Sequence, residues 1–537
     1  MASLLPRLKQ QIDLPIFLVI LLLITSFYFF IFSQTGLLSS GFRFFVDDHQ
    51  IAAINHDLSL KSLPRTILDW LLLDNSARFR PAYYTHVILQ TQIFGLNAGL
   101  WFGYLCLLTS LTNFSLFAFA KLLKIPTTLA LLFSGLTLWG AQAVIWARPS
   151  LPEALGTFFL ATSLMFAALG SRISKYQTVS NIIFATFAVL TSLSKESFII
   201  FIPALVSIKI WSDSTFNEIP LRQALSQNKF LAGVLGGVMI LEVLYIKFAI
   251  GTQATGYAGF DENNLKISNL LRTAATLTKA SHPSFLGLAI ALLIAIAVFK
   301  REPLLALFKK LYPVVFILLA SIIPQILLYA KSGIDGYYLI PGILGYSLLT
   351  VVVLSLILER SKFLGFLLTT LAVILLCFQL PPMLSTYNQM AKDSRDMNAL
   401  LQNIQSCTAN EEPILVALNP RVRYEVAVSL KRTLNYAFQR NNLLVATYGL
   451  EKTNFFSDTL RDQEKIWSFL DPKTIENLYE DKTILNFPDK SKIKAVLVFD
   501  KLDNDFLKSS LAWFMPSHYK RSEYPISFAF TRLYCRQ

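Results

Sequence analysis

Two adjacent carboxylates, Asp47 and Asp48, follow the first long apolar run of the chain, in the segment 43–50. Ionised side chains are costly at the edge of a bilayer and neighbouring like charges repel, so a pair in this place indicates a function. Either carboxylate could take a proton from a hydroxyl group as a general base. The alternatives are a solvated turn or the cap of a helix.

Four basic residues could hold an anion such as a phosphate. Arg78 and Arg80 flank a phenylalanine and precede a proline in the segment 75–84. Guanidinium groups offer fixed, paired donors to phosphate and keep their charge. Lys195 and Arg148 are further candidates. Any of them could instead extend toward lipid headgroups, as basic residues near membranes commonly do.

Supporting roles fall to one acid and four tyrosines. Glu196 directly follows Lys195 and could hold that lysine in place. The tyrosines could line a pocket or hydrogen-bond a phosphate, although Tyr also gathers in interfacial belts; they are Tyr83, Tyr84, Tyr337 and Tyr338.

A divalent cation is a weaker alternative near the carboxylates. His49 and His56 are seven positions apart, which would put them on one helical face. They could bind a metal together with Asp47 or Asp48. No other cofactor is indicated.

The composition identifies a polytopic α-helical membrane protein. Of the 537 residues, 54% are hydrophobic and 43 are Phe, which exceeds the needs of a soluble core. The apolar run 14–32 is long enough to span a bilayer and reads as a retained anchor. Ten more apolar segments give about eleven transmembrane helices; they are 97–119, 126–146, 150–170, 179–194, 196–211, 230–250, 283–299, 312–330, 337–357 and 363–380.

Charge bias predicts the orientation. Lys and Arg gather in alternate loops, which the positive-inside rule assigns to the cytoplasm together with the N-terminus. The net charge of +14 is thereby explained by topology and anionic lipid headgroups, and no nucleic-acid motif competes with that interpretation. The candidate residues named above then lie in the outward-facing loops.

The chain divides into two predicted domains. Residues 1–395 form a transmembrane domain whose first outer loop, 33–96, contains an interfacial helix at 64–73. Residues 396–537 form a small extracytoplasmic α/β domain, with a helix at 421–434 and strands at 414–418, 443–447, 495–499 and 526–530. Cys407 and Cys535 both fall there and either pair or remain free thiols.

Three motifs in order resemble GT-C glycosyltransferases, closest to the protein O-mannosyltransferase and aminoarabinose transferase branches. The first is an anchor helix followed by the Asp-Asp pair, an interfacial helix and the Arg-aromatic-Arg-Pro turn. The second is the Lys195-Glu196 turn, and the third is the start of an aromatic-Leu-x-Pro helix at Tyr337-Tyr338. The resemblance covers residues 10–380 and leaves the outer domain without a match.

This resemblance implies transfer of a single sugar from a polyprenyl-phosphate carrier to a hydroxyl of a protein, glycan or lipid acceptor on the outer face of the cell membrane. Asp47 matches the first acid of the motif and is favoured over Asp48 as the base of an inverting reaction. The basic residues would bind the donor phosphate, and the tyrosines would line the sugar pocket.

Two other classes of protein remain open. A lipid-linked sugar flippase would also carry charges among many helices, and a non-catalytic relative would only bind the carrier lipid. A flippase needs polar groups within its spans. The predicted spans hold few apart from Glu242 and Lys247, which favours surface chemistry.

Overall fold

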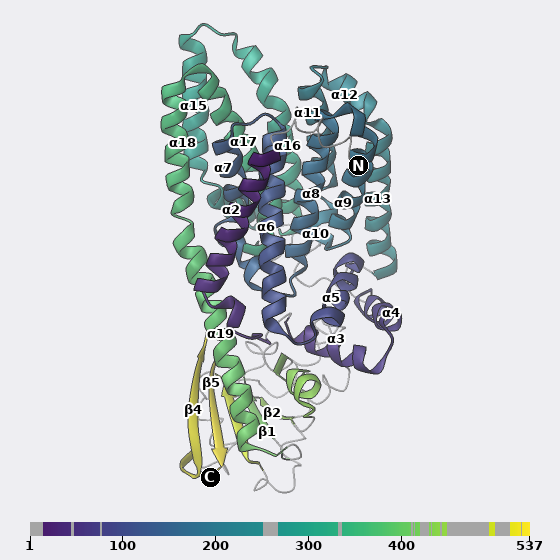
Figure 1. The fold of residues 1–537 in the computed structure, drawn as a ribbon, viewed down its shortest axis with the longest axis vertical. Helices are drawn as coiled ribbons and strands as arrows, with labels where there is room; N and C mark the ends of the chain where they lie inside the picture. Colours follow the sequence, from purple (N-terminus) through teal and green to yellow (C-terminus); the bar gives the residue numbers. More distant parts are fainter. Residues whose placement is uncertain are drawn as a thin grey trace.

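The computed structural model describes residues 14–44, 48–75, 78–250, 267–330, 334, 336–409, 412, 414–418, 429–430, 432–440, 443–447, 493–499, 516–527 and 529–536. A helical bundle occupies one end of the molecule and a small sheet the other, with three short helices between them (Figure 1). The chain is a polytopic α-helical membrane protein with a small C-terminal α/β domain.

Eight helices in the described part of the chain are long and apolar enough to cross a membrane, or up to ten if each of two bent pairs is one span. The eight are α2 (Leu14–Gln34), α6 (Ala98–Leu122), α8 (Pro152–Arg172), α10 with α11 (Glu196–Phe216), α13 with its π-turn (Lys229–Ile250), α16 (Leu304–Leu328), α17 (Ile340–Arg360) and α18 with α19 (Lys362–Cys407). All eleven predicted segments contain helix, but α9 (Gln177–Ser192) is short, so the count of eleven spans is not confirmed.

Two pairs of helices in the bundle are separated by sharp bends, and the first of these bends breaks a predicted span. The segment predicted as one helix at 126–146 is α7 (Thr127–Leu138) followed, after a 77° bend, by η3 (Ala141–Ala147). Gly140 lies between them at φ +106°, which only glycine adopts readily. The second bend, of 71°, separates α14 (Ile267–Ala280) from α15 (Pro283–Phe299). There His282 has left-handed φ and ψ and precedes a proline.

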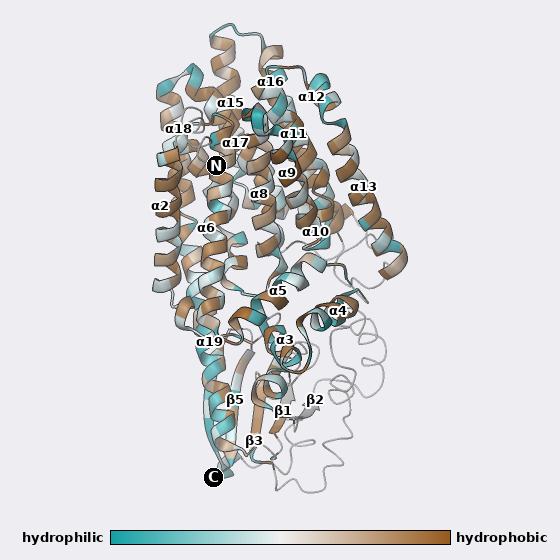
Figure 2. Ribbon diagram, turned by 45° about the vertical axis from the view of Figure 1, so that its right-hand side comes forward, coloured by the Kyte–Doolittle hydropathy of each residue, from teal (hydrophilic) through white to brown (hydrophobic). Residues whose placement is uncertain are grey.

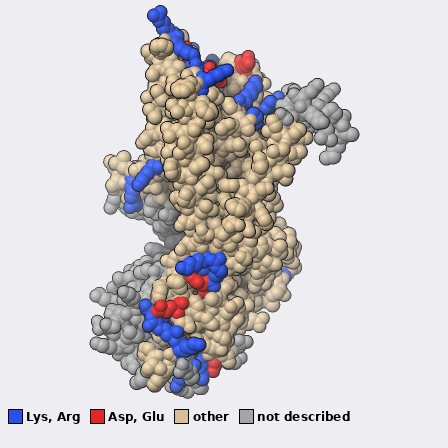
Figure 3. Space-filling view, turned by 60° about the vertical axis from the view of Figure 1, so that its left-hand side comes forward, with Lys and Arg blue, Asp and Glu red and all other residues tan. Residues whose placement is uncertain are grey.

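The bundle is layered by burial. Helices α6, α8 and α17 form its centre, whereas α2, α13 and α18 expose leucine and phenylalanine side chains outward. Hydrophobic residues cover most of the bundle (Figure 2), and one face shows a broad middle zone with few charged side chains (Figure 3). An apolar belt of this kind matches a bilayer core, where every backbone polar group is paired within a helix.

The segment predicted as the first outer loop folds into three helices at the end of the bundle nearest the sheet, here termed the outer end. They are α3 (His49–Leu60), α4 (Leu63–Asp74) and α5 (Pro81–Phe94). Helix α4 contains the residues predicted to form the interfacial helix. Pro64 lies in its first turn, where the missing backbone N–H removes no helical hydrogen bond. Leu68 and Leu72 are exposed while Trp70 is buried, so α4 has one apolar face turned outward.

The outer domain is a five-stranded mixed sheet of order β2-β1-β3-β5-β4. The parallel strands β1 (Ile414–Leu418), β2 (Leu443–Thr447) and β3 (Ala495–Phe499) coincide with three predicted strands. The fourth prediction, 526–530, is wrong: it straddles the turn of an antiparallel hairpin between β4 (Tyr519–Ile526) and β5 (Ala529–Arg536). Ile526 ends β4, and Ala529 and Phe530 begin β5.

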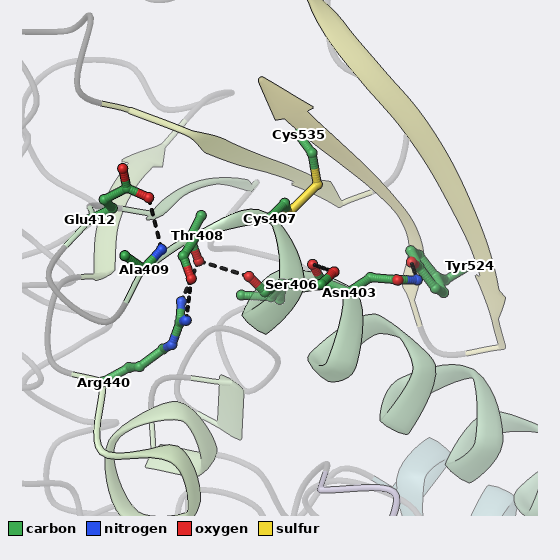
Figure 4. Close-up of a disulfide and its surroundings, with 10 residues drawn as sticks. Asn403, Ser406, Cys407, Thr408, Ala409, Glu412, Arg440, Tyr524 and Cys535 are labelled. Atoms are coloured by element: carbon green, nitrogen blue, oxygen red, sulfur yellow. Dashed lines mark hydrogen bonds between the residues drawn. A yellow bond between two sulfur atoms is a disulfide. The ribbon is translucent and has the colours of Figure 1, made fainter. Parts of the chain in front are cut away.

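Helix α19 (Leu380–Cys407) carries the chain from the bundle to the sheet and packs along β4 and β5. Pro381 and Pro382 lie in its first turn, so they start the helix instead of ending one. The helix runs through the predicted domain boundary at 395/396 without a break. At its end Cys407 forms a disulfide with Cys535 of β5, 128 positions away (Figure 4).

Candidate functional site

Asp48 lies at the outer end of the bundle, one residue before α3, and its side chain is buried. It makes no capping hydrogen bond to α3, so the helix-cap alternative does not apply to it. The Ser150 hydroxyl donates to Asp48 Oδ1 over 3.4 Å, and the Tyr83 hydroxyl donates to the Ser150 carbonyl over 2.7 Å. Asp47, the favoured base, lies outside the described residues.

The turn between α4 and α5 is built around an ion pair. Arg80 Nη2 and Nε contact Asp74 Oδ1 at 2.6 and 3.2 Å, and the Arg80 backbone N–H donates to Asp74 Oδ2 over 3.0 Å. Burial raises the pKa of Asp74, against the opposing effect of the Arg80 charge, and the pKa of Arg80 is held well above its ordinary value. The guanidinium lies 5.6 and 5.2 Å from the Tyr83 and Tyr84 ring centroids. The charge of Arg80 is thus balanced inside the protein.

Glu196 fastens this turn to the bundle. Its Oε1 accepts a hydrogen bond of 3.0 Å from the Phe79 backbone N–H, between Arg78 and Arg80. Next to it, the Ala82 N–H donates to the Leu193 carbonyl over 3.0 Å. Glu196 was predicted to hold Lys195 in place. Its carboxylate instead points toward α5 and supports the turn that carries Arg78 and Arg80.

Lys195 instead forms its ion pair with Glu153 in the first turn of α8. Both side chains are buried. Glu153 was not among the predicted residues; the available signal was an acid beside Pro152, five positions after Arg148. Its second oxygen, Oε2, is buried without a hydrogen-bond partner among the described residues.

Tyrosine rings connect the two remaining cations. Lys195 Nζ lies 4.3 Å from the Tyr338 ring centroid, and Arg148 lies 5.9 Å from that of Tyr337. The Tyr337 and Tyr338 centroids are 4.2 Å apart. The turn that carries both tyrosines, η8 (Gly336–Tyr338), packs against η3, which leads directly into Arg148. Two adjacent tyrosine rings therefore lie between Arg148 and Lys195, each in contact with one of the two cations.

The fold thus brings the described candidates into one region. Asp48, Ser150 and Tyr83 are linked by hydrogen bonds. Arg148, two positions before Ser150 in the chain, contacts Tyr337 and so connects this group to Tyr338 and Lys195. Glu196 follows Lys195 and leads to the arginine turn. Tyr84 completes the set, since its hydroxyl donates to Gln50 Oε1 over 3.4 Å. Ser150, Asp74 and Glu153 are the additions that sequence reasoning missed.

The histidines do not form the suggested metal site. Seven helical positions correspond to about 10 Å along the axis, which is too far for both rings to bind one ion at about 2 Å. His49 and His56 instead contact residues of the outer domain. Among the described residues, no group of three or more His, Cys, Asp or Glu side chains is placed to hold a metal.

Comparison with known proteins gives structural matches alone. No protein-family model matches the chain, and none of the curated proteins matches it. The fold is similar to ArnT from Cupriavidus metallidurans bound to undecaprenyl phosphate (TM-score 0.48, 10% identity, 95% of this chain and 97% of that chain). The apo state of ArnT gives a TM-score of 0.46 at 11% identity, over 96% and 97% of the two chains.

The Archaeoglobus fulgidus oligosaccharyltransferase in its apo form is a further similar structure, with a TM-score of 0.44 and 10% identity over 94% of this chain and 73% of that chain. At TM-scores below 0.5 these likenesses concern the general arrangement of the chain alone. The function proposed below rests on this chain's own side chains.

Proposed function

We propose that the protein is a membrane glycosyltransferase that moves a single sugar from a polyprenyl-phosphate carrier to an acceptor hydroxyl, with inversion. The observation that carries this proposal is a buried carboxylate, Asp48, beside a row of cations at the outer end of an apolar bundle. A lipid-linked donor would keep its chain in the bilayer and present its phosphate and sugar at this level.

In this reaction the Asp47–Asp48 pair takes the proton of the acceptor hydroxyl, whose oxygen attacks the anomeric carbon. The bond from that carbon to the phosphate oxygen breaks on the opposite face, and the carrier phosphate leaves with the electron pair. Asp47 keeps its motif-based assignment as the base, and the proximity of the Ser150 hydroxyl to Asp48 supports a role for Asp48 in holding the acceptor or sharing the proton.

The leaving phosphate requires positive groups. We assign this role to Arg78, Arg148 and Lys195. Arg78 and Arg148 are partly exposed and have fork-shaped donors. Arg80 is better suited to building the turn, because Asp74 binds both its guanidinium and its backbone N–H. Tyr83, Tyr84, Tyr337 and Tyr338 would line the sugar pocket.

We also propose that the site and the sheet face outward and that the N-terminus is cytoplasmic. The loops rich in Lys and Arg supply the charge bias. The Cys407–Cys535 disulfide supports the same direction, because disulfides persist in oxidising compartments.

The test is sugar transfer by the purified protein from a panel of radiolabelled polyprenyl-phosphate monosaccharides to cell-envelope acceptors. Asp47→Asn and Asp48→Asn are compared with Asp69→Asn, a control in α4 whose side chain pairs with Lys61 and Arg65. We expect transfer by the wild type and the control and a loss of about 100-fold or more when the base is removed. Full transfer by both site variants would overturn the assignment of the base. Folded, lipid-binding protein without transfer from any donor would favour a flippase or a carrier-binding protein.

A further inference from the structure

The outer domain contacts the helix that begins beside Asp48. The His49 ring lies between two groups of that domain: Ser429 Oγ is 3.1 Å from its Nδ1, and Arg432 Nη1 is 3.4 Å from its Nε2. Further along α3, the His56 ring centroid lies 5.1 Å from that of Tyr436. His49, Ser429 and Arg432 are all buried.

The spacing of these residues shows that two helical faces meet. Ser429, Arg432 and Tyr436 belong to the 429–438 helix, of which residue 431 lies outside the described residues, and are separated by three and four positions. His49 and His56 are separated by seven. Positions three, four and seven apart share one side of a helix, so each helix presents one side to the other.

The partners of His49 fix the position of its proton. A guanidinium can only donate, so Nε2 of His49 must accept from Arg432. A neutral imidazole carries one proton, which then lies on Nδ1 and is donated to Ser429 Oγ. Both edges of the ring are therefore oriented by the outer domain, at the residue directly after Asp48.

An apolar core lies behind these polar contacts. Ile51 and Ile54 of α3 belong to the same buried cluster as Leu430 and Leu434 of the 429–438 helix. Burying these apolar side chains together stabilises the contact between the two elements. The first outer loop and the outer domain thus share a core, and α3 is packed between the site and the sheet domain (Figure 1).

The sheet domain is also fastened to the bundle helix α19. The Ser527 backbone N–H donates to Asp393 Oδ1 over 2.9 Å, and the Ser527 hydroxyl and Asp393 Oδ2 also form a hydrogen bond. Asn403 of α19 contacts the Tyr524 hydroxyl. Because α19 and the 429–438 helix contribute side chains to the same apolar cluster, α19 helps to hold the 429–438 helix beside α3.

We propose that the outer domain positions Asp48, with Arg432 and Ser429 acting as positioning residues through His49. This inference rests on the proposed function of the Asp47–Asp48 pair. Arg432 orients His49, His49 fixes the first turn of α3, and that turn sets the direction of the Asp48 side chain. A misplacement of the carboxylate by about 1 Å can lower the rate about 100-fold. We therefore expect the contact to matter for turnover and not for donor binding.

The experiment uses variants of the full chain. Four carry single substitutions, Arg432→Ala, Arg432→Lys, Ser429→Ala and His49→Ala, and a fifth combines His49→Ala and Arg432→Ala. The control is Arg521→Ala on β4, an exposed arginine that pairs with Glu523. Transfer is measured as kcat and as KM for the donor. Hydrogen exchange of the backbone at residues 48–60 is measured on the same samples.

We expect Arg432→Ala to lower kcat by about 10- to 100-fold with little change in KM, and to speed exchange in the first turn of α3. Arg432→Lys keeps a charge and a donor and should recover part of the rate. Once His49 is alanine, Arg432→Ala should have no further effect, because the two residues act in series. Ser429→Ala should give a smaller loss of the same kind.

Additive losses in the double variant, or a rise in KM alone, would overturn the positioning role. Unchanged exchange at residues 48–60 in both Arg432 variants would also overturn it, whether or not the protein is active. Failure of the proposed function looks different: the wild type then transfers no sugar, while the exchange measurement still tests the contact between the outer domain and α3.

Discussion

At the residue scale, two cations of the site, Arg80 and Lys195, are paired with buried acids. The motifs singled out these residues because aromatic, basic and acidic residues occur at recognisable spacings within each motif. Their partners were harder to predict. Lys195 pairs with Glu153, 42 positions away on another helix, and Arg80 pairs with Asp74 six positions away. Both choices depend on how the helices pack, which local spacing does not encode.

The Lys195–Glu153 pair leads to the first prediction. Glu153→Gln leaves the buried ammonium of Lys195 without its counter-ion, and removing one partner of a buried pair costs about 3 to 5 kcal/mol. We expect a marked fall in thermal stability in detergent and weaker donor binding. Adding Lys195→Met should restore most of the stability and none of the activity. If the stability losses of the two changes simply add, the pair is not coupled in the folded protein.

At the element scale, α5 combines two buried tyrosines with a partly buried histidine. Tyr83 and Tyr84 belong to its first turn, and His86 Nε2 lies 2.8 Å from the Tyr104 hydroxyl. Burial lowers the pKa of His86 from 6.5 to about 4. The folded protein therefore disfavours protonation, while the unfolded chain takes up the proton below about pH 6.5.

This shift predicts an acid-sensitive contribution to stability. The contribution is complete above pH 6.5 and is lost between about pH 6.5 and 4, with a loss of up to about 3 kcal/mol. His86→Gln can still hydrogen-bond Tyr104 but does not titrate, so its unfolding temperature should fall less between pH 7 and pH 5. His518→Gln, at an exposed position, is the control. Equal falls in His86→Gln and the wild type would contradict this account.

Element boundaries were predicted well where apolar runs are bounded by clear breakers. The three parallel strands coincide with the prediction because each is a compact run of β-forming residues. The misplaced fourth strand and the broken span at Gly140 have a common cause. An apolar stretch can cross a turn when its side chains are buried on both sides, so hydrophobicity alone does not locate the turn.

At the scale of the whole molecule, the two domains are joined by a continuous helix, a shared core and the contact of the 429–438 helix with α3. Sequence predicted that an outer domain exists, because polarity changes after residue 380. It did not predict that this domain reaches the site. The contact joins residues about 380 positions apart, such as His49 and Ser429, and no motif connects them.

The last prediction concerns the disulfide that closes this arrangement. Cys407→Ser with Cys535→Ser opens a loop of 128 positions, which typically costs about 2 to 4 kcal/mol, and the long loop favours the upper part of that range. Reduction by dithiothreitol should act in the same way. Because the outer domain is packed on α3, its loosening should lower the transfer rate while the bundle stays folded.

Limited proteolysis followed by mass spectrometry measures the first effect, with cleavage expected between residues 407 and 537 before any cleavage in the bundle. The control is Cys377→Ser, which removes an exposed free thiol at the end of α18. Faster cleavage without loss of transfer would mean that the outer domain can loosen without disturbing α3. Loss of transfer that tracks cleavage would connect the disulfide to the site through α19, the sheet and the 429–438 helix.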